Sequence, residues 1–357
     1  MICSLITGAA HAQGVSAITD GPYVFYRGQQ AVVKSVAGSR KDYVVQTDSF
    51  DIEDKPKKVL TVHVDGHPEW DFNVKLKSRI NNEPVVSMGA SKALVLSDIE
   101  GEFATFRNLL IANKVIDEKY NWLFGKGQLV IAGDLFDRGK QVSQYLWLLY
   151  KLEDEVKAKG GYVHVILGNH DIMNLGGDFR YVQPEYAANA QLMQEAYQNL
   201  YGPDTELGRW LRSKNLIEKI GGYLVLHGGV SPELLARHLS IEQINEQARP
   251  YYDRWMQVKN DTTRLLFGGT TSPFWYRGYF MEPKATEALI DSTLAFYGCK
   301  RIIIGHTVID RVSSLYNGKV IGVDVNEHEQ THEALLIEHN KYYRVDDHGN
   351  RTELYIH

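Results

Sequence analysis

The chain has 357 residues, of which 44% are hydrophobic and 23% charged, and these values are typical of an ordinary globular protein. Its length favours one large domain with a smaller one beside it. The formal net charge of −5 gives no indication of nucleic-acid binding, because proteins that bind the phosphate backbone carry an excess of Lys and Arg. The sequence also lacks a run of about eighteen apolar residues, so no membrane span is expected.

The N-terminal segment, residues 1–19, resembles the end of a secretory signal. In "MICSLITGAAHAQG" a short apolar stretch precedes Ala10-His11-Ala12, and small residues at this spacing are typical of a cleavage site. We expect a signal-peptide remnant and linker here, which would make the protein periplasmic or secreted. A plain disordered N-terminus, the alternative, would leave it cytoplasmic. Cleavage would leave Cys299 as the sole cysteine, so no intramolecular disulfide is expected.

Residues 20–88 are predicted to form a small β domain. Short runs such as "YVFYRG", "AVVKSV", "DYVVQT", "VLTVHV" and "WDFNVKL" are often alternating, and clusters of Gly, Asp, Lys or Pro separate them. The pattern shows no functional site in this part of the chain.

Residues 89–345 alternate between strand and helix patterns, which favours a layered α/β domain. The strand-like runs are apolar without alternation, as expected for strands buried on both faces. "FATFRNLLIANKVI" and "VSQYLWLLYKLEDEV" carry apolar residues near a 3.6-residue period and are predicted helices. Further helical segments are expected at about 178–220 and 232–295, and residues 346–357 as a C-terminal tail.

Polar residues follow the predicted strands of this domain, where open α/β sheets bind their ligands. They occur in "SDIEG", "GDLFDRG", "GNHD", "HGG" and "GHT". A single Asp or His after a strand is usually a turn residue or a cap, but five such turns predict a shared site. Carboxylates, an amide and imidazoles without a thiolate suit Mn, Fe, Zn or Mg. Arg138 among them is better suited to phosphate oxygens than to a metal.

These motifs, in this order, resemble the calcineurin-like metallophosphoesterases. "GDxxDRG" with "GNH" and "HGG" resembles the phosphoprotein-phosphatase branch, and "SPFWYRGY" with "LGRWLRSKN" is most like the bacterial Shewanella-like protein phosphatases. The resemblance covers residues of about 92–340. It implies an α/β fold with a central β-sandwich flanked by helices, here preceded by the small β domain. It also implies two divalent metal ions and a phosphorylated substrate.

The resemblance implies a role for each matching residue. Asp98 would bind the first metal, Asp134 would bridge both, and Asn169, His227 and His306 would complete the second. The two ions would share the attacking hydroxide and lower its pKa. Arg138 and Arg277 would hold phosphate oxygens, and His170, oriented by Asp137, would protonate the leaving group.

One motif departs from the family pattern. The family has Asp-x-His-Gly where this chain has Asp98-Ile99-Glu100-Gly101. Glu100 would replace a neutral imidazole by a carboxylate, and a more anionic oxygen shell favours Mn²⁺ or Mg²⁺ over Zn²⁺. Our hypothesis is that Glu100 still ligates. Alternatively it swings to solvent, and the first site is weak or empty.

The resulting expectation is a metal-dependent phosphomonoesterase acting on a phosphoprotein or a small phosphate ester. Aromatic residues in "PFWYRGY" and in the Tyr-rich insertion at about 178–220 could flank a phosphotyrosine ring, or could simply be packing. A phosphodiesterase or dinucleoside-polyphosphate hydrolase on the same fold is an alternative. A phosphate-binding protein without turnover is another, because Glu100 could disable the first metal site.

A second motif, His328-Glu329-Gln330-Thr331-His332, matches the H-E-x-x-H pattern of zinc peptidases. That chemistry needs both His on one helical face. The segment lies between two strand-like runs, so it is interpreted as a polar loop.

Overall fold

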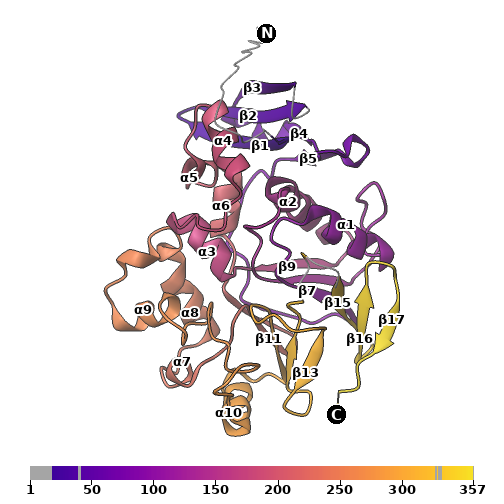
Figure 1. Cartoon of the computed structure of the whole chain (residues 1–357), viewed down its shortest axis with the longest axis vertical. Coiled ribbons are helices and arrows are strands. Elements are labelled where there is room, and N and C mark those ends of the chain that lie inside the picture. The colour runs from indigo at the N-terminus through magenta and orange to yellow at the C-terminus, as the bar shows by residue number, and fades with distance from the viewer. Residues whose placement is uncertain (1–17, 39–41, 326–327, 329–331, 357) are drawn as a thin grey trace.

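The computed structural model describes residues 18–38, 42–325, 328 and 332–356. The proposed signal remnant therefore falls mostly outside the described residues. Figure 1 shows a small β unit at one end, a central pair of sheets, and helices packed around them. Within the described residues, no helix combines the length and the apolar character needed to cross a bilayer.

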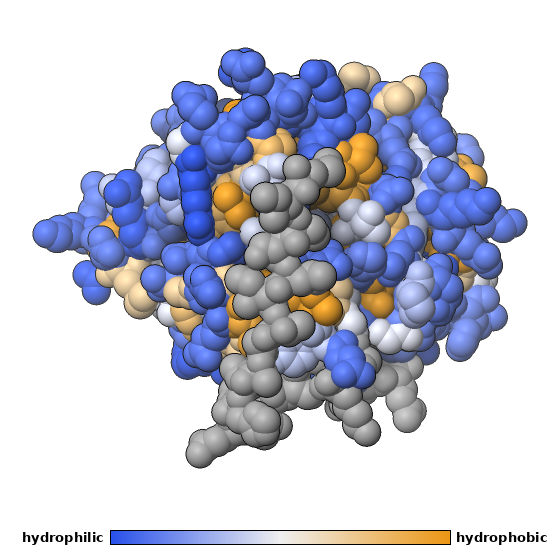
Figure 2. All heavy atoms as spheres, turned by 90° about the horizontal axis from the view of Figure 1, so that it is seen from above, coloured by the Kyte–Doolittle hydropathy of each residue, from blue (hydrophilic) through white to orange (hydrophobic). Residues whose placement is uncertain are grey.

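The N-terminal unit consists of an antiparallel three-stranded sheet and a hairpin. The sheet contains β1 (Asp20–Arg27), β2 (Gln30–Gly38) and β3 (Tyr43–Asp51), and the hairpin contains β4 (Val59–Val62) and β5 (Phe72–Lys75). The 3₁₀ helices η1 (Ile52–Lys57) and η2 (Pro68–Trp70) lie between these strands in the chain. Viewed from this end, the molecule is mainly hydrophilic, with hydrophobic residues gathered near the centre of the face (Figure 2). The all-β character expected for this segment is thus observed.

Two six-stranded mixed sheets form the centre of the molecule. The first, in spatial order, consists of β13 (Ser313–Leu315), β14 (Val320–Gly322), β12 (Arg301–Ile304), β11 (Tyr223–Leu226), β10 (Ile217–Ile220) and β6 (Val86–Ser87). The second consists of β17 (Arg351–Glu353), β16 (Lys341–Asp346), β15 (Glu333–Glu338), β7 (Lys92–Leu96), β8 (Gln128–Ala132) and β9 (Tyr162–Ile166). The segment interpreted as a tail thus contributes the edge strand β17.

The two sheets pack face to face. Ala93 and Val95 of β7 belong to an apolar cluster that also contains Val225 of β11 and Ile303 of β12. The alternate residues of β7, such as Leu94, face a second and larger core beneath the helices. Both faces of these strands are therefore buried, which explains their continuous apolar runs. The expected α/β sandwich is confirmed.

Ten α-helices and two further 3₁₀ helices occur in the described residues. They are α1 (Phe103–Ala112), α2 (Val142–Ala158), α3 (Asn169–Gly176), α4 (Pro184–Leu192), α5 (Tyr197–Leu200), α6 (Glu206–Arg212), α7 (Pro232–Leu235), α8 (Ile241–Ala248), η3 (Arg249–Tyr251), η4 (Trp255–Gln257), α9 (Asp261–Phe267) and α10 (Glu287–Tyr297). Helices α4 to α10 fall within the two segments that were predicted to be helical.

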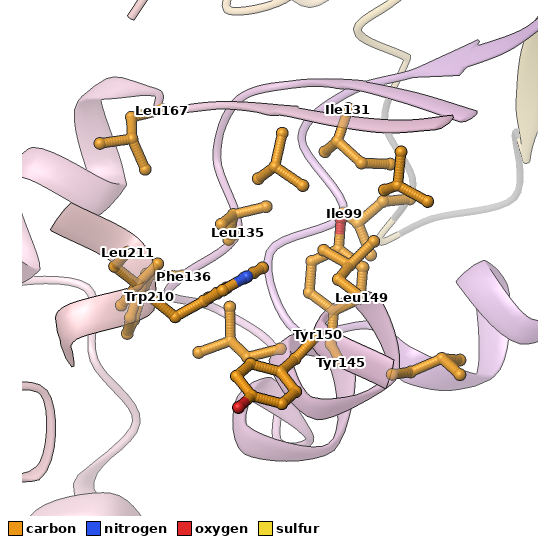
Figure 3. Close-up of a cluster of buried hydrophobic side chains, with 14 of the residues drawn as sticks. Ile99, Ile131, Leu135, Phe136, Tyr145, Leu149, Tyr150, Leu167, Trp210 and Leu211 are labelled. Carbon is orange, nitrogen blue, oxygen red and sulfur yellow. The ribbon is translucent and has the colours of Figure 1, made fainter. Parts of the chain in front are cut away.

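Helix α2 is buried nearly all round, because it lies between the N-terminal unit and the second sheet (Figure 1). Trp147 donates its indole N–H to the carbonyl of Pro22 at 2.8 Å, which ties the helix to β1. On the opposite side Tyr145 and Leu149 point towards Ile99 and Leu135, which follow β7 and β8 (Figure 3). The helix therefore supports the turns that carry the polar residues.

A buried carboxylate joins the N-terminal unit to the rest of the molecule. Glu206, at the start of α6, accepts hydrogen bonds from the hydroxyls of Tyr26 in β1 and Tyr150 in α2. It also forms an ion pair with Lys55 of η1, with 2.8 Å between Nζ and Oε2. Residues from the N-terminal unit, α2 and α6 thus share one carboxylate, so the small β unit is packed firmly against the rest of the molecule at this point.

Candidate metal and phosphate site

Two sets of parallel strands, one from each sheet, end at the same place. Strands β7, β8 and β9 are parallel, and so are β11, β12 and β14. The turns after them carry the ten residues expected from the sequence: Asp98, Glu100, Asp134, Asp137, Arg138, Asn169, His170, His227 and His306, with Arg277 reaching in from the segment before α10. The chain therefore builds one site from five strand ends and the segment that carries Arg277.

The turns are held in left-handed conformations that side-chain-bearing residues rarely adopt. Positive φ values, from 45° to 80°, occur at Asp98, Glu100, Asp134, Asp137, Arg138 and His306. Gly168 is required beside them, because a Cβ atom there would lie 2.1 Å from Asp134 Oδ1. Strain of this kind clusters where a site must be preformed. The glycine of "GNHD" thus permits the close approach of Asp134.

Asp134, Asn169, His227 and His306 form the first group of potential metal ligands. His227 Nε2 lies 3.1 Å from Asp134 Oδ2 and 2.9 Å from Asn169 Oδ1. The other ring nitrogen, Nδ1, donates to the Ala132 carbonyl at 2.8 Å, so Nε2 is free to bind a metal. Asp134, His227 and His306 bring ligand atoms within 4.8 Å of one another. His306 Nε2 is buried without a hydrogen-bond partner, as expected for a ligand atom.

Asp98 and Glu100 form the other side of the site. Asp98 Oδ2 accepts a hydrogen bond from the backbone N–H of His306 at 3.1 Å, which links the ends of β7 and β12. Glu100 is 1% exposed, so it does not swing to solvent. One of its oxygens pairs with Arg138 and lies 3.7 Å from His170 Nε2, and the other contacts His328 Nε2. Glu100, Asp134 and His170 also bring potential ligand atoms within 4.8 Å of one another.

His170 and Asp137 form a buried pair. Asp137 Oδ2 lies 2.6 Å from His170 Nδ1, and Asp137 Oδ1 accepts a hydrogen bond from Asn174 Nδ2 at 2.7 Å. Tyr197 in turn donates to Asn174 Oδ1 at 2.9 Å. This chain of contacts fixes the imidazole so that Nε2 faces the cavity.

The cavity has a volume of about 330 Å³ and is lined by both cations and carboxylates. Arg138, after β8, and Arg277, in the segment before α10, both line it, and Arg277 Nη1 donates to the His306 carbonyl at 2.5 Å. Tyr181 lies at its edge, with its ring 5.1 Å from that of His170 and 47% of the residue exposed. The Arg138 guanidinium lies 5.7 Å from the same ring. The mouth therefore offers an aromatic surface beside two guanidinium groups.

The electrostatics of the cavity are those of a cation site. Burial raises the pKa of Asp98 to about 6, and the neighbouring Asp134 adds to the shift. Burial together with the charge of His227 lowers the pKa of His306 to about 2, which keeps its imidazole neutral. At His227 the carboxylates of Asp134 and Asp98 outweigh burial and raise the pKa to about 10. Closely spaced buried carboxylates and a neutral imidazole are a donor set that fits divalent cations.

Three residues near the site were not among the expected site residues. Asp324, after β14, is buried and lines the cavity. Tyr181 belongs to the Tyr-rich insertion whose aromatic residues were expected either to flank a phosphotyrosine ring or to be packing, and it lies between α3 and α4. His328 belongs to the H-E-x-x-H match, of which residues 329–331 lie outside the described residues. Its ring meets Glu100 through Nε2 and Glu102 through Nδ1, the latter at 3.2 Å.

Comparison with known proteins agrees with this geometry. A family model for calcineurin-like phosphoesterases matches residues 91–310. Shewanella-like protein phosphatase 2 of Arabidopsis thaliana is 26% identical over 282 residues, covering 66% of this chain and 71% of the relative. Shewanella-like protein phosphatase 1 of Plasmodium berghei is also 26% identical, covering 72% of each chain.

A solved structure matches almost the whole chain. The cold-active protein-tyrosine phosphatase of a psychrophilic Shewanella species superposes with a TM-score of 0.84 at 37% identity, covering 94% of this chain and 99% of that one. The expected fold, a calcineurin-like phosphatase domain preceded by a small β unit, is therefore confirmed, and so is the phosphatase resemblance. The chain belongs to the calcineurin-like phosphoesterase family and is a metal-dependent hydrolase of phosphate esters.

Proposed function

We propose that this hydrolase is a two-metal phosphomonoesterase that prefers aryl phosphates, phosphotyrosine among them. The proposal rests mainly on the buried His170–Asp137 pair. This pair presents Nε2 of His170 to a cavity whose lining includes Arg138 and Arg277. Such a pair can protonate a leaving oxygen while the arginines hold the phosphate.

Divalent ions fit the donor set described above. Asp134, Asn169, His227 and His306 would hold one ion, and Asp98, Asp134 and Glu100 the other. Bound there, the ions would supply a nucleophile at neutral pH and neutralise charge on the phosphoryl group. Glu100 supports the proposal because it is buried and faces Asp134, with Arg138 and His328 restraining its carboxylate. With three carboxylates around the first ion, we propose Mn²⁺ as the preferred metal.

The two arginines favour monoesters over diesters. A monoester presents a dianion with three free oxygens, and forked donors such as Arg138 and Arg277 bind such oxygens in pairs. A diester has fewer free oxygens and a second substituent that must fit the same 330 Å³ cavity. We therefore expect the enzyme to prefer monoesters, which are smaller and more anionic, over diesters.

Tyr181 supports the aryl preference. Its ring is half exposed and lies against His170, where a leaving group must sit to receive a proton. An aromatic leaving group could pack on this ring, which an alkyl group would do less well. The protein-tyrosine phosphatase of Shewanella, similar over nearly its full length, agrees with this substrate class.

The test is hydrolysis by the metal-stripped chain, resupplied in turn with Mn²⁺, Mg²⁺, Zn²⁺ and Fe²⁺. Substrates would be phosphotyrosine, phosphoserine, bis(p-nitrophenyl) phosphate and diadenosine tetraphosphate. We expect the fastest turnover with phosphotyrosine and Mn²⁺. Faster cleavage of the diester or the tetraphosphate would contradict the proposal. Phosphate binding without turnover under any metal would favour the non-catalytic alternative. A periplasmic location stays a prediction that rests on residues 1–14.

A further inference from the structure

A second hollow lies where the N-terminal unit meets α6 and η3. It has a volume of about 610 Å³, within the range of small-molecule sites. Five basic residues line it: Lys55, Arg79, Arg209, Arg212 and Arg249. In the described part of the chain, no Asp or Glu lines this basic pocket. In a protein with a formal net charge of −5, a pocket lined by five basic side chains is unexpected.

Part of this positive charge is not compensated. Lys55, Arg209 and Arg212 each pair with a carboxylate that does not line the pocket, namely Glu206, Asp204 and Asp253. Arg249 instead donates to the carbonyls of Arg212 and Lys214, both at 2.7 Å, and to Asn215 Oδ1 at 2.6 Å. These acceptors are neutral, so its charge stays unbalanced.

Arg79 supplies the second unbalanced charge. It is exposed in the segment that joins the N-terminal unit to the central sheets, and it forms no ion pair with any described residue. Low-dielectric walls around like charges focus the potential in the hollow, which raises the local concentration of anions.

The arginine side chains that line the basic pocket are also held in fixed positions before any ligand binds. Besides the three bonds of Arg249, Arg212 Nη1 donates to the carbonyls of Tyr201 and Gly208 at 2.8 and 2.9 Å. Side chains fixed in this way lose little entropy when a ligand binds. Guanidinium forks match the paired oxygens of phosphate groups better than a lone ammonium does.

We propose that the basic pocket is a second anion site, which binds ligands bearing two or more phosphate groups. It shares no lining residue with the metal-site cavity in the described structure, so it is a separate site. Lys55 is contributed by the N-terminal unit, for which the sequence indicated no functional site. The proposal does not depend on the substrate preference proposed above.

Calorimetric titration of the full-length chain with inorganic pyrophosphate tests the proposal, and EDTA prevents capture of the probe by metal. Arg79→Glu should weaken binding at least about tenfold and Arg79→Ala less, because charge-assisted contacts carry the affinity. Arg237→Glu is the matched control, since Arg237 is also exposed and forms no ion pair with a described residue. It should leave binding unchanged.

Arg138→Ala, at the metal site, should also leave pyrophosphate binding unchanged. Loss of binding in this variant would assign the probe to the metal site and overturn the proposal. Equal affinity of wild type and Arg79→Glu would overturn it as well. A ligand with two phosphate groups has two possible sources, a phosphoprotein segment and a free metabolite. Titration with a doubly phosphorylated peptide in parallel distinguishes them. Tighter, Arg79-dependent binding of the peptide indicates a segment of a phosphoprotein, and tighter binding of pyrophosphate indicates a free metabolite.

Discussion

Substitution of Asp137 by Asn should slow the reaction in proportion to how much the leaving group needs a proton. Asn174 Nδ2 already donates to Asp137 Oδ1, so an amide at position 137 must keep its oxygen on that side. Its NH₂ group would then face His170 Nδ1 in place of the carboxylate now 2.6 Å away. An imidazolium, which carries a hydrogen on Nδ1, would meet a second donor. The proton needed at Nε2 would therefore be harder to hold.

The magnitude follows from the bond that is lost. A hydrogen bond to a buried charged group contributes about 1.5–3 kcal/mol, and each 1.4 kcal/mol corresponds to roughly tenfold in rate. We expect kcat to fall about 10–150-fold with phenyl phosphate, whose phenoxide leaves poorly, which is a part of the full effect of general acid catalysis of roughly 100-fold or more. With p-nitrophenyl phosphate, whose leaving group departs without a proton, the fall should be only about threefold.

The assay is steady-state kinetics on both substrates at saturating Mn²⁺, with metal content measured on the same samples. Unchanged metal content would show that the variant acts on proton transfer. Equal losses on the two substrates would refute the reasoning, because they would mean that Asp137 positions something other than the acid.

Four further outcomes are expected. Glu100→Ala should bind one Mn²⁺ fewer than wild type by elemental analysis, whereas Glu102→Ala, two residues away, should keep full occupancy; unchanged occupancy in the first variant would rule out ligation by Glu100. His328→Gln should weaken Mn²⁺ binding by about tenfold, the usual effect of a residue that orients a ligand, and a thermal-shift titration with the metal measures it. Lys214→Met should lower the free energy of unfolding in urea by about 3–5 kcal/mol, because Glu83 and Glu153 lose their buried partner. At Glu83 burial raises the pKa, but Lys214, with help from the Tyr162 hydroxyl and Lys157, lowers it below 4.5. The pair therefore stabilises the fold above that pH, and the difference between Lys214→Met and wild type should shrink as the pH falls below it. Glu206→Gln should cost about 3 kcal/mol by the same assay, since Lys55 loses its counter-charge; a cost near zero would mean that the N-terminal unit is held elsewhere.

The positions of the site residues at the strand ends were predictable because each strand end has a recognisable local sequence pattern. An apolar run followed by a short turn that contains Gly and a ligand-type residue can be recognised without knowledge of the fold, and at least one of these glycines has a clear physical cause. At Gly168 a side chain would collide with Asp134. The convergence of these turns also followed from the sequence, since parallel strands place their carboxyl ends on one edge.

The remaining parts depend on contacts between segments far apart in the chain. Nothing in the sequence around His328 indicates that it meets Glu100, which is 228 residues away. The same holds for Tyr181, whose position against His170 is set by the packing of the segment between α3 and α4. The five basic residues of the basic pocket are spread over positions 55 to 249. In the sequence, each of them alone is indistinguishable from an ordinary charged residue on the surface. Helix α2 was predicted, but not that it would be enclosed on both sides.

The division of the site between two sheets has a mechanical consequence. Asp98, Asp134 and Asn169 follow strands of one sheet, whereas His227 and His306 follow strands of the other. An ion held by both groups cross-links two sheets that are otherwise joined by apolar packing and a few hydrogen bonds, such as that from the His306 N–H to Asp98. Metal binding should therefore slow the separation of the sheets, and amide exchange in β11 and β12 should report metal occupancy as sensitively as turnover does.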